Sequence, residues 1–411
     1  MDCTVNKSAI KGTVYAPTSK SVAHRAFIIA SLAKGDSVLY GDFSSDDVKA
    51  TIGALKALGA SFEEHEGFTV CHPIVKTKQA AIDCMESGST LRFIVPLAAA
   101  LGTETEINGR GKLPSRPIKE LLQSLKGIKY DYENTMPFKF SGQLCGTEFE
   151  ISGDVSSQYV TGLLIAMLAL KRRCELKING VLKSKPYVDI TVDVIKEFGG
   201  DIIETENGYV VDGSGLVGRE YKVEGDFSGA SFMLTLGAIN GVVTVEGLNP
   251  LSKQGDKIII DVLKSMGAKT EYADAAYTVY ESKLNAVDFD ATDYPDLAPI
   301  IAVAMAKADG ISRIKGADRL VDKESDRKRG ILKMLTALNV DCKEKENEIE
   351  IVGKGEFSTA FIDGQSDHRM VMAAVVALST VGGKVSDSEA VAKSYKKFFE
   401  DFKNSGGVYV R

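Results

Sequence analysis

SKSVAHRAFIIASLA, residues 19–33, is a short polar turn that runs into an apolar segment of helical length. Five later stretches repeat this design: residues 87–101, 156–170, 228–239, 295–306 and 366–378. The six starts are 68, 68, 71, 68 and 71 residues apart and fall at Ser21, Ser89, Ser157, Ser228, Asp296 and Asp367. Such regular spacing predicts six copies of one supersecondary unit.

A second marker has a similar period. Helix-like segments end on residues suited to a left-handed C-cap, spaced 68, 72, 68, 72 and 67 residues apart: Gly59, Gly127, Gly199, Gly267, Asn339 and Gly406. Runs such as GYVVDG (208–213) predict strands between the helices. The apolar stretches are hydrophobic on nearly all sides, so we expect them inside each domain with sheets around them. Six units exceed one core, which favours two bodies of three units with a ligand site in the cleft between them.

The composition excludes several classes of protein. The 411 residues are 44% apolar and 26% charged, as in ordinary globular proteins, and the net charge of −6 opposes nucleic-acid binding. The cysteines form no CxxC pair and have no histidine at metal-ligand spacing, which predicts neither zinc nor disulfides and fits the cytoplasm. We expect no signal peptide and no membrane span, because the apolar runs are too short.

Cations recur at predicted helix starts, although the positive end of the helix dipole disfavours them. Lys20 and Arg25 lie near the first start, and Arg116 precedes Pro117, a residue typical of the first helical position. Backbone N–H groups at helix starts bind anions, and added cations would suit a multiply charged ligand. Taken alone, each cation could equally be a solvated surface side chain.

Three further motifs are ambiguous by themselves. On a helix, the cations of DKESDR, Lys323 and Arg327, would share one face and leave Glu324 poised for proton transfer, but an exposed salt-bridged helix reads the same way. SSQ (156–158) suits either a ligand or a plain N-cap. In SDHRM (366–370), an aspartate cap followed by an exposed histidine is the alternative to an anion site.

The motifs together resemble a known family. In chain order they are SKSVAHRA (19–26), ESGSTLRF (86–93), SRPIKEL (115–121), GDVSSQY (153–159), SKPYVDIT (184–191), YPDLAP (294–299), DKESDR (322–327), SDHRM (366–370) and AKSYKKFF (392–399). This set is similar to the EPSP synthases, the 3-phosphoshikimate 1-carboxyvinyltransferases. The resemblance implies an α/β (α+β) fold, a two-domain inside-out α/β barrel of six βαβαββ repeats. One domain would be contiguous over residues 16–221, and the other would combine 1–15 with 222–411.

The implied reaction transfers the enolpyruvyl group of phosphoenolpyruvate to the 5-hydroxyl of shikimate 3-phosphate and releases phosphate. This step belongs to the shikimate pathway of aromatic amino acid biosynthesis. The resemblance implies a cytoplasmic monomer without metal or organic cofactor, with no nucleic-acid or membrane partner. Two acid–base groups are what the chemistry needs, since the methylene carbon gains a proton and the hydroxyl loses one.

The family roles carry over to matching positions. The implied catalytic residues are Asp296 as base and hydroxyl anchor, Glu324 as proton donor, and Lys20. The implied shikimate 3-phosphate ligands are Lys20, Ser21, Arg25, Ser156, Ser157, Gln158, Ser184, Asp296 and Lys323. The implied phosphoenolpyruvate ligands are Lys20, Gly88, Arg116, Gln158, Arg327, Arg369 and Lys393.

Several positions depart from the family pattern. Glu86 stands where asparagine is frequent, Ser89 where threonine is frequent, and Arg319 where an asparagine commonly meets the acceptor. Lys396 and Lys397 replace the usual Pro-Asp pair. These differences, with Phe93, bear on glyphosate sensitivity and on acceptor contact rather than on the chemistry.

Two other functions compete with this one. The related enzymes that transfer enolpyruvyl to UDP-N-acetylglucosamine normally carry a cysteine before the Arg-Pro pair, and residues 108–115 contain none. A noncatalytic six-unit binding scaffold would make the pattern of charges incidental.

Overall fold

The computed structural model describes all residues, 1–411, and divides the chain into two units. Lys20–Val223 form the contiguous unit, and Met1–Ser19 together with Glu224–Arg411 form the split unit. The expected boundaries at 15/16 and 221/222 therefore lie four and two residues early. The reason is backbone pairing, since the Ala16 and Ser19 N–H groups donate to carbonyls of Glu246 and Glu224 in the split unit.

The contiguous unit contains three repeats of one pattern. The first comprises α1 (Lys20–Leu32), β3 (Ser37–Tyr40), α2 (Asp46–Ala57), β4 (Ser61–His65), β5 (Phe68–His72) and the late strand β14 (Glu220–Lys222). The second comprises β6 (Gln79–Asp83), α3 (Gly88–Leu101), β7 (Glu104–Asn108), η1 (Leu113–Ser115), α4 (Lys119–Ser124), β8 (Ile128–Tyr130) and β9 (Phe138–Gly142). The third comprises β10 (Glu148–Ser152), α5 (Ser157–Ala169), β11 (Cys174–Asn179), α6 (Lys185–Glu197), β12 (Asp201–Thr205) and β13 (Gly208–Asp212).

The split unit contains the other three repeats. The fourth comprises the early strand β2 (Ile10–Tyr15), α7 (Phe227–Asn240), β15 (Gly241–Glu246), η2 (Gly255–Ile258), α8 (Ile259–Ser265), β16 (Lys269–Ala273) and β17 (Ala276–Tyr280). The fifth comprises β18 (Asp288–Asp290), α9 (Ala298–Lys307), β19 (Gly310–Lys315), η3 (Ala317–Leu320), α10 (Arg327–Ala337), β20 (Asp341–Lys345) and β21 (Glu348–Gly353). The sixth comprises β22 (Ala360–Ile362), α11 (His368–Leu378), β23 (Gly383–Val385), η4 (Ser388–Lys393), α12 (Phe398–Asn404), β24 (Val408–Val410) and the N-terminal strand β1 (Cys3–Asn6).

All six sheets have four strands in one order. The first strand of each repeat pairs in parallel with the second, and the last strand lies antiparallel between the second and the third. Three strands come from elsewhere in the chain: β14 pairs with β3, β2 pairs with β15, and β1 lies between β23 and β24. The predicted βαβαββ repeat is thus confirmed. In three of the six repeats, one strand comes from a distant part of the sequence, near a point where the chain passes between units or near its N-terminus.

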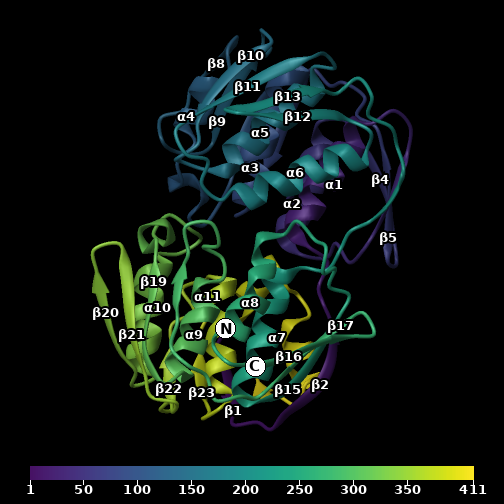
Figure 1. The fold of residues 1–411 in the computed structure, drawn as a ribbon. Coiled ribbons are helices and arrows are strands. Elements are labelled where there is room, and N and C mark those ends of the chain that lie inside the picture. Colours follow the sequence, from purple (N-terminus) through teal and green to yellow (C-terminus); the bar gives the residue numbers. More distant parts are fainter. The chain divides into compact units, whose positions relative to one another are not determined.

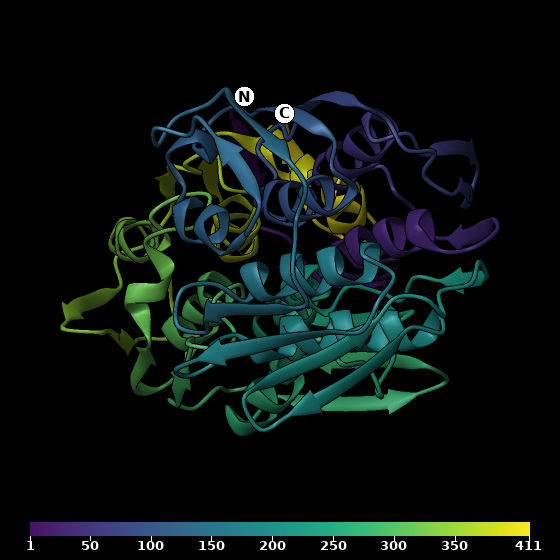
Figure 2. The ribbon, with the colours of Figure 1, turned by 90° about the horizontal axis from the view of Figure 1, so that it is seen from above.

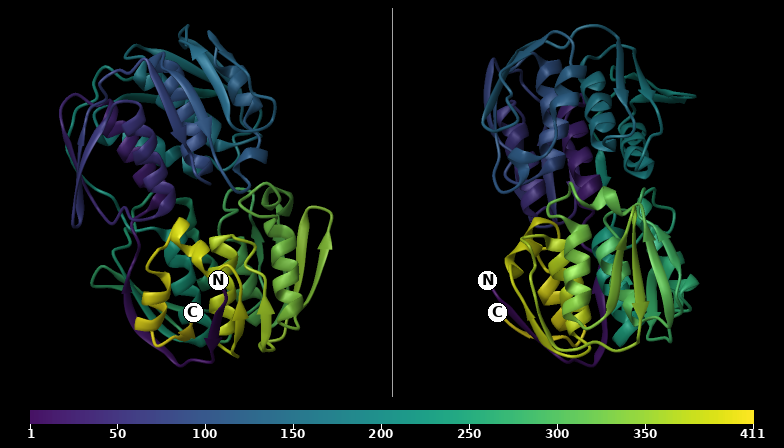
Figure 3. Two further views of the ribbon diagram at one scale, coloured as in Figure 1. Left: turned by 180° about the vertical axis from the view of Figure 1, so that it is seen from behind. Right: turned by 90° about the vertical axis from the view of Figure 1, so that its left-hand side faces the viewer.

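Each unit has its helices inside and its sheets outside, as predicted for this fold. Helices α1, α3 and α5 lie in the middle of the contiguous unit (Figures 1 and 2), and α7, α9 and α11 lie in the middle of the split unit (Figure 3). In α7 every residue from Phe227 to Ile239 is buried. Apolar side chains all round these helices leave no polar face for solvent, so the sheets must cover them. None of the helices combines the length and the apolar character needed to cross a bilayer.

The repeat spacing marks a physical feature. All six predicted C-cap residues adopt positive φ, between 62° and 100°, and a strand begins within two residues of each. Left-handed backbone at a helix end suits glycine and is tolerated by asparagine. The helix stops are therefore correctly predicted.

Candidate active site

In the split unit, one guanidinium gathers three carboxylates. Arg327, the first residue of α10, has a fully buried side chain. Its Nη1 donates to Asp296 Oδ1 at 2.7 Å, Nη2 to Glu324 Oε2 at 2.6 Å, and Nε to Asp367 Oδ2 at 2.8 Å. Burial opposes its charge, but Asp367, Glu324 and Asp296 outweigh burial and raise the pKa of Arg327. We call these residues, with Arg369, the Arg327 cluster.

Asp296 lies between two guanidiniums. In addition to Arg327 on one oxygen, Arg369 Nη2 donates to Asp296 Oδ2 at 2.8 Å. Burial alone would favour the neutral acid, yet Arg369, Arg327 and Lys323 outweigh burial and hold the pKa of Asp296 below its usual range. The carboxylate is therefore ionised and held at both oxygens.

The start of α11 joins this cluster through its cap. Asp367 is the N-cap, and its Oδ1 accepts from the Arg369 N–H at 2.9 Å. Ser325 Oγ donates to Asp367 Oδ2 at 2.9 Å. Burial opposes ionisation of Asp367, but Arg327 prevails and lowers its pKa. The alternative of an exposed histidine is wrong, because His368 is only 1% exposed.

DKESDR does not form the helix that its spacing suggested. Residues 322–325 are turns and bends, and α10 begins only at Arg327 with Asp326 as N-cap. Ser and Asp side chains compete for backbone N–H groups and favour caps over helix interiors. The cluster forms nonetheless, because the turn folds Glu324 back onto Arg327.

Two lysines predicted to bind substrate lie in this unit. Burial lowers the pKa of Lys323 to about 8, with Arg327 adding to the effect and Asp296 opposing it. Lys393 Nζ donates to the Ser366 carbonyl at 2.7 Å, on the loop that leads into α11. Lys393 thus lies against the loop of the Asp367 cap, whereas Lys323 lies within the field of the Arg327 cluster.

In the contiguous unit, the predicted residues gather at helix starts. None of α1, α3, α5 and α6 has an acidic residue in its first turn. Lys20 opens α1, and its Nζ donates to Asp47 Oδ2 at 2.8 Å, with both side chains largely buried. Ser156 caps α5 by accepting from the Gln158 N–H at 3.2 Å, so the N-cap interpretation of SSQ is confirmed.

Arg25 points into the protein rather than outward. Its Nε donates to Thr191 Oγ1 at 2.6 Å, and its Nη groups donate to the carbonyls of Ser21 at 2.6 Å and Tyr187 at 2.7 Å. Burial lowers its pKa to about 9. Arg25 therefore ties α1 to α6 internally, and its contact with shikimate 3-phosphate stays a prediction.

Gly88 and Arg116 lie close together, and their binding of phosphoenolpyruvate stays a prediction. A Cβ on Gly88 would lie 2.5 Å from Arg116 Nη1, so only glycine allows this approach. The helix after Arg116 begins later than expected, at Lys119 rather than Pro117. A residue before proline avoids the helical region, and Arg116 accordingly is extended, with ψ 136°.

Sequence reasoning missed Arg92, which organises this site. Its Nη1 donates to Gln158 Oε1 at 2.8 Å and its Nη2 to the Pro117 carbonyl at 3.0 Å. Gln158 Nε2 in turn donates to Ser89 Oγ at 3.1 Å. The available signal was Arg92 itself, the one charged residue in the apolar run 91–101, where a buried charge needs partners.

Asp256 has an unusual pKa, and Ser184 has an unusual backbone conformation. Burial and the nearby Asp296 raise the pKa of Asp256 to about 7, against the opposing field of Arg369. No sequence pattern marked this aspartate. Ser184, the N-cap of α6, has φ 56° and makes no side-chain cap bond. A serine in left-handed backbone is strained, and such strain often marks functional positions.

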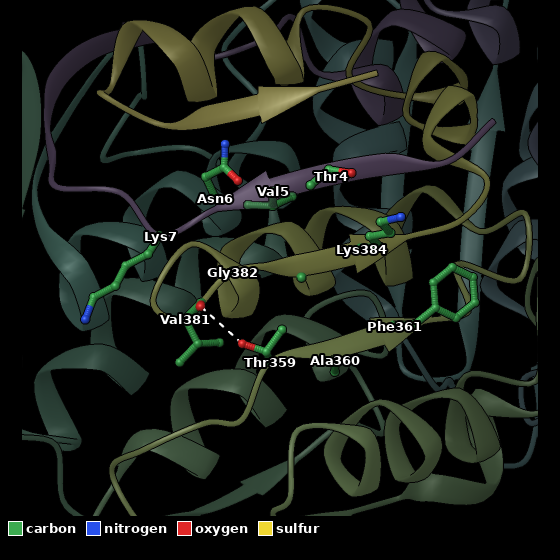
Figure 4. A pocket seen from close by; sticks show the side chains of 11 residues that line it. Thr4, Val5, Asn6, Lys7, Thr359, Ala360, Phe361, Val381, Gly382 and Lys384 are labelled. Carbon is green, nitrogen blue, oxygen red and sulfur yellow. Dashed lines mark hydrogen bonds between the residues drawn. The ribbon is translucent and has the colours of Figure 1, made fainter.

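A separate hollow lies on the outer face of the sheet formed by β22, β23 and β1 (Figure 4). Its volume is about 510 Å³. Lys384 stands between Thr4 and Phe361 in the strand register. The hollow contains none of the predicted site residues, so it is no part of the candidate site.

Comparison with known proteins points to one family. The model of the EPSP synthase (3-phosphoshikimate 1-carboxyvinyltransferase) family matches residues 5–402. The 3-phosphoshikimate 1-carboxyvinyltransferase of Methanocorpusculum labreanum is 36% identical, covering 99% of both chains, and that of Clostridium kluyveri is 37% identical, covering 98% of this chain and 97% of its own. The structure of EPSP synthase from Acinetobacter baumannii covers all of both chains, with a TM-score of 0.83 and 25% identity. The enolpyruvyl transferase NikO from Streptomyces tendae, at 15% identity and a TM-score of 0.79, shares the fold.

Proposed function

Because this chain belongs to the EPSP synthase family, we propose that the residues gathered at its helix starts bind and convert the two substrates of that reaction. The chain is a transferase of the shikimate pathway. It moves the enolpyruvyl group of phosphoenolpyruvate to shikimate 3-phosphate, and aromatic amino acid biosynthesis depends on the product. The family match along nearly the whole chain carries this assignment.

Phosphoenolpyruvate brings a phosphate and a carboxylate that need cations. In our proposal, Lys20, Gly88, Arg116 and Gln158 of the contiguous unit and Arg327, Arg369 and Lys393 of the split unit bind it. The close approach of Arg116 to Gly88 supports this, because it leaves backbone and guanidinium donors side by side at a helix start. For Arg327, whose three nitrogens donate to carboxylates, the first role is to hold the Arg327 cluster together.

Shikimate 3-phosphate is proposed to bind through hydroxyl, amide and cationic groups. They are Lys20, Ser21, Arg25, Ser156, Ser157, Gln158 and Ser184 of the contiguous unit, with Asp296 and Lys323 of the split unit. The absence of first-turn carboxylates at α1, α5 and α6 supports an anionic ligand there, since the helix dipoles remain unneutralised. Arg25 would act mainly by fixing Ser21, whose carbonyl it already holds.

Asp296 and Glu324 are proposed to move the protons. Glu324 protonates the methylene carbon of phosphoenolpyruvate while the 5-hydroxyl oxygen, anchored by Asp296, adds to C2 and gives its proton to Asp296. The methyl group of the adduct then returns a proton as phosphate leaves, which restores the double bond. Two guanidiniums make Asp296 a weak base before substrates arrive. Substrate anions that pair with Arg369 would weaken that hold and raise the pKa of Asp296 as the tetrahedral adduct forms. Lys20, at the start of α1, balances the developing charge.

Phosphate release tests the assignment of substrates. Purified chain with phosphoenolpyruvate should release phosphate with shikimate 3-phosphate and not with UDP-N-acetylglucosamine. Turnover only with the sugar nucleotide would overturn the choice of acceptor. Turnover with neither acceptor would favour the alternative function, a noncatalytic binding scaffold. We also propose a cytoplasmic monomer, which light scattering at micromolar concentration and cell fractionation would check.

A further inference from the structure

Four buried polar side chains form a continuous hydrogen-bonded line across α1, α2 and α3. His24 Nδ1 lies 2.7 Å from Thr51 Oγ1, Thr51 Oγ1 lies 2.7 Å from Thr90 Oγ1, and Thr90 Oγ1 donates to Ser87 Oγ at 2.8 Å. All four side chains are inaccessible to solvent. We call them the buried hydroxyl chain. Buried hydrogen-bonded networks of this kind rigidify the elements they join.

The direction of the protons in this chain follows from its far end. Thr90 has one hydroxyl proton, and its acceptors are Ser87 Oγ and, at 3.4 Å, the Asp47 carbonyl. With that proton on Ser87, each remaining link has one donor when Thr51 donates to Thr90 and His24 donates to Thr51. We therefore assign His24 the tautomer that carries its proton on Nδ1.

His24 stays neutral, and its second nitrogen is unpaired. Burial, then Lys20 and Arg25, hold the pKa of His24 well below its usual range. Nε2 has no hydrogen-bond partner. A buried acceptor without a donor is costly, and an apolar residue would avoid that cost. What histidine adds at this position is the Nδ1 donor that begins the chain.

The buried hydroxyl chain ends next to the residues that are proposed to bind phosphoenolpyruvate. Ser87 is the N-cap of α3 and directly precedes Gly88 and Ser89, the turn against which Arg116 packs. Asp47, whose carbonyl is near Thr90, holds Lys20 through its carboxylate. The buried hydroxyl chain thus joins the turn of α3 to the start of α1.

We propose that His24, Thr51 and Thr90 are positioning residues for phosphoenolpyruvate, which hold the Ser87–Ser89 turn in register with Lys20. This inference rests on the proposed function, because it takes Gly88 and Arg116 as phosphoenolpyruvate-binding residues. The three side chains touch no substrate themselves. Loss of one link would let the turn relax while Ser156 and Ser157, at the start of α5, stay in place.

Thr51→Val removes the central hydroxyl with almost no change in shape. We expect the KM for phosphoenolpyruvate to rise at least about fivefold, as for a displaced binding group, while kcat and the KM for shikimate 3-phosphate stay within about twofold. Thr51→Ser keeps the hydroxyl and should restore the wild-type KM. Thr235→Val on α7 is the matched control, since Thr235 Oγ1 is buried without a partner, and it should leave all constants unchanged.

Different outcomes separate this inference from the proposed function. A smaller rise in Thr51→Val, or an equal rise in both KM values, overturns the positioning role. Gly88→Ala, whose Cβ would clash with Arg116, should raise the KM for phosphoenolpyruvate; if it does not, the proposed binding residues are wrong. If Thr51→Val does not fold, nitrogen NMR of the wild-type protein tests the inference instead. A His24 that is protonated on Nε2, or on both nitrogens at pH 7, would contradict the proposed hydrogen bonds of the buried hydroxyl chain.

Discussion

At the scale of single residues, pairing of buried charges determines the chemistry of the candidate site. Arg327 brings Asp296, Glu324 and Asp367 together from three separate segments of the chain. Removing one member of such a group leaves an uncompensated buried charge, which costs more than the pairing contributes. Substitutions that preserve shape and hydrogen bonding therefore test chemistry best.

Glu324→Gln separates proton donation from structure. The amide oxygen can still accept from Arg327, but no acidic proton is available. We expect turnover to fall at least about a hundredfold with little change in KM, in line with the usual contribution of a general acid. Steady-state phosphate release measures this. Glu344→Gln, at an exposed glutamate paired with Lys328, is the control and should be fully active; near-normal turnover in Glu324→Gln would remove Glu324 from the mechanism.

Lys323 predicts a basic limit to substrate binding. Because burial lowers its pKa to about 8, Lys323 is charged below that pH and neutral above it, so anion binding should weaken as the pH rises through 8. The profile of kcat/KM for shikimate 3-phosphate reports this group in the free enzyme. Lys323→Arg keeps the charge at high pH and should move the limb upward. A limb unchanged in this variant would assign it to another group.

At the scale of elements, the helix ends are the most predictable features and the polar turns the least. Glycine and asparagine stops depend on local backbone geometry alone, and all six occur as predicted. The helix starts predicted for DKESDR and SRPIKEL were wrong. An N-cap residue in the first motif and a proline in the second make the helix begin later than predicted. Nearest-neighbour effects of this kind override side-chain spacing.

Two glycines test the stop signal by opposite effects. Gly199 follows α6 at φ 80°, so Gly199→Ala should lower the free energy of unfolding by about 1–2 kcal/mol. Gly53 lies inside α2 with open space around it, so Gly53→Ala should raise stability by about 0.5–1 kcal/mol. Urea unfolding at pH 7 compares the two. A Gly199→Ala chain as stable as Gly53→Ala would refute the cap interpretation.

At the scale of the whole molecule, the path of the chain matters more than its composition. The core of the contiguous unit draws only on residues between Val22 and Val223. The core of the split unit needs Cys3, Val5, Ile10 and Val14 in addition to residues after Glu224. The units therefore differ in what a fragment of the chain can form.

Fragments should behave accordingly. Residues 20–223 alone should fold cooperatively, because the fragment contains every strand and core residue of its unit. Residues 224–411 alone should not, because without β1 the sheet loses the strand between β23 and β24. A permuted fragment that runs from residue 224 to Arg411 and then continues into residues 1–19 should fold. The reason is that β1 and β24, the strands next to the two ends of the natural chain, pair with each other (Figure 1). Circular dichroism with thermal melting checks all three, and a folded 224–411 fragment would contradict the argument.

The sequence by itself determined the repeat, its helix stops, the buried character of the central helices and, through resemblance, the reaction. These depend on local backbone preference and apolar patterning, which sequence spacing records directly. Only the tertiary structure decided that β14, β2 and β1 complete distant repeats, that Arg25 and Arg92 bond internally, and that Asp256 and His24 lie buried beside charges. Such features arise where residues far apart in sequence exclude water together, and electrostatic interactions become strong only after that packing exists.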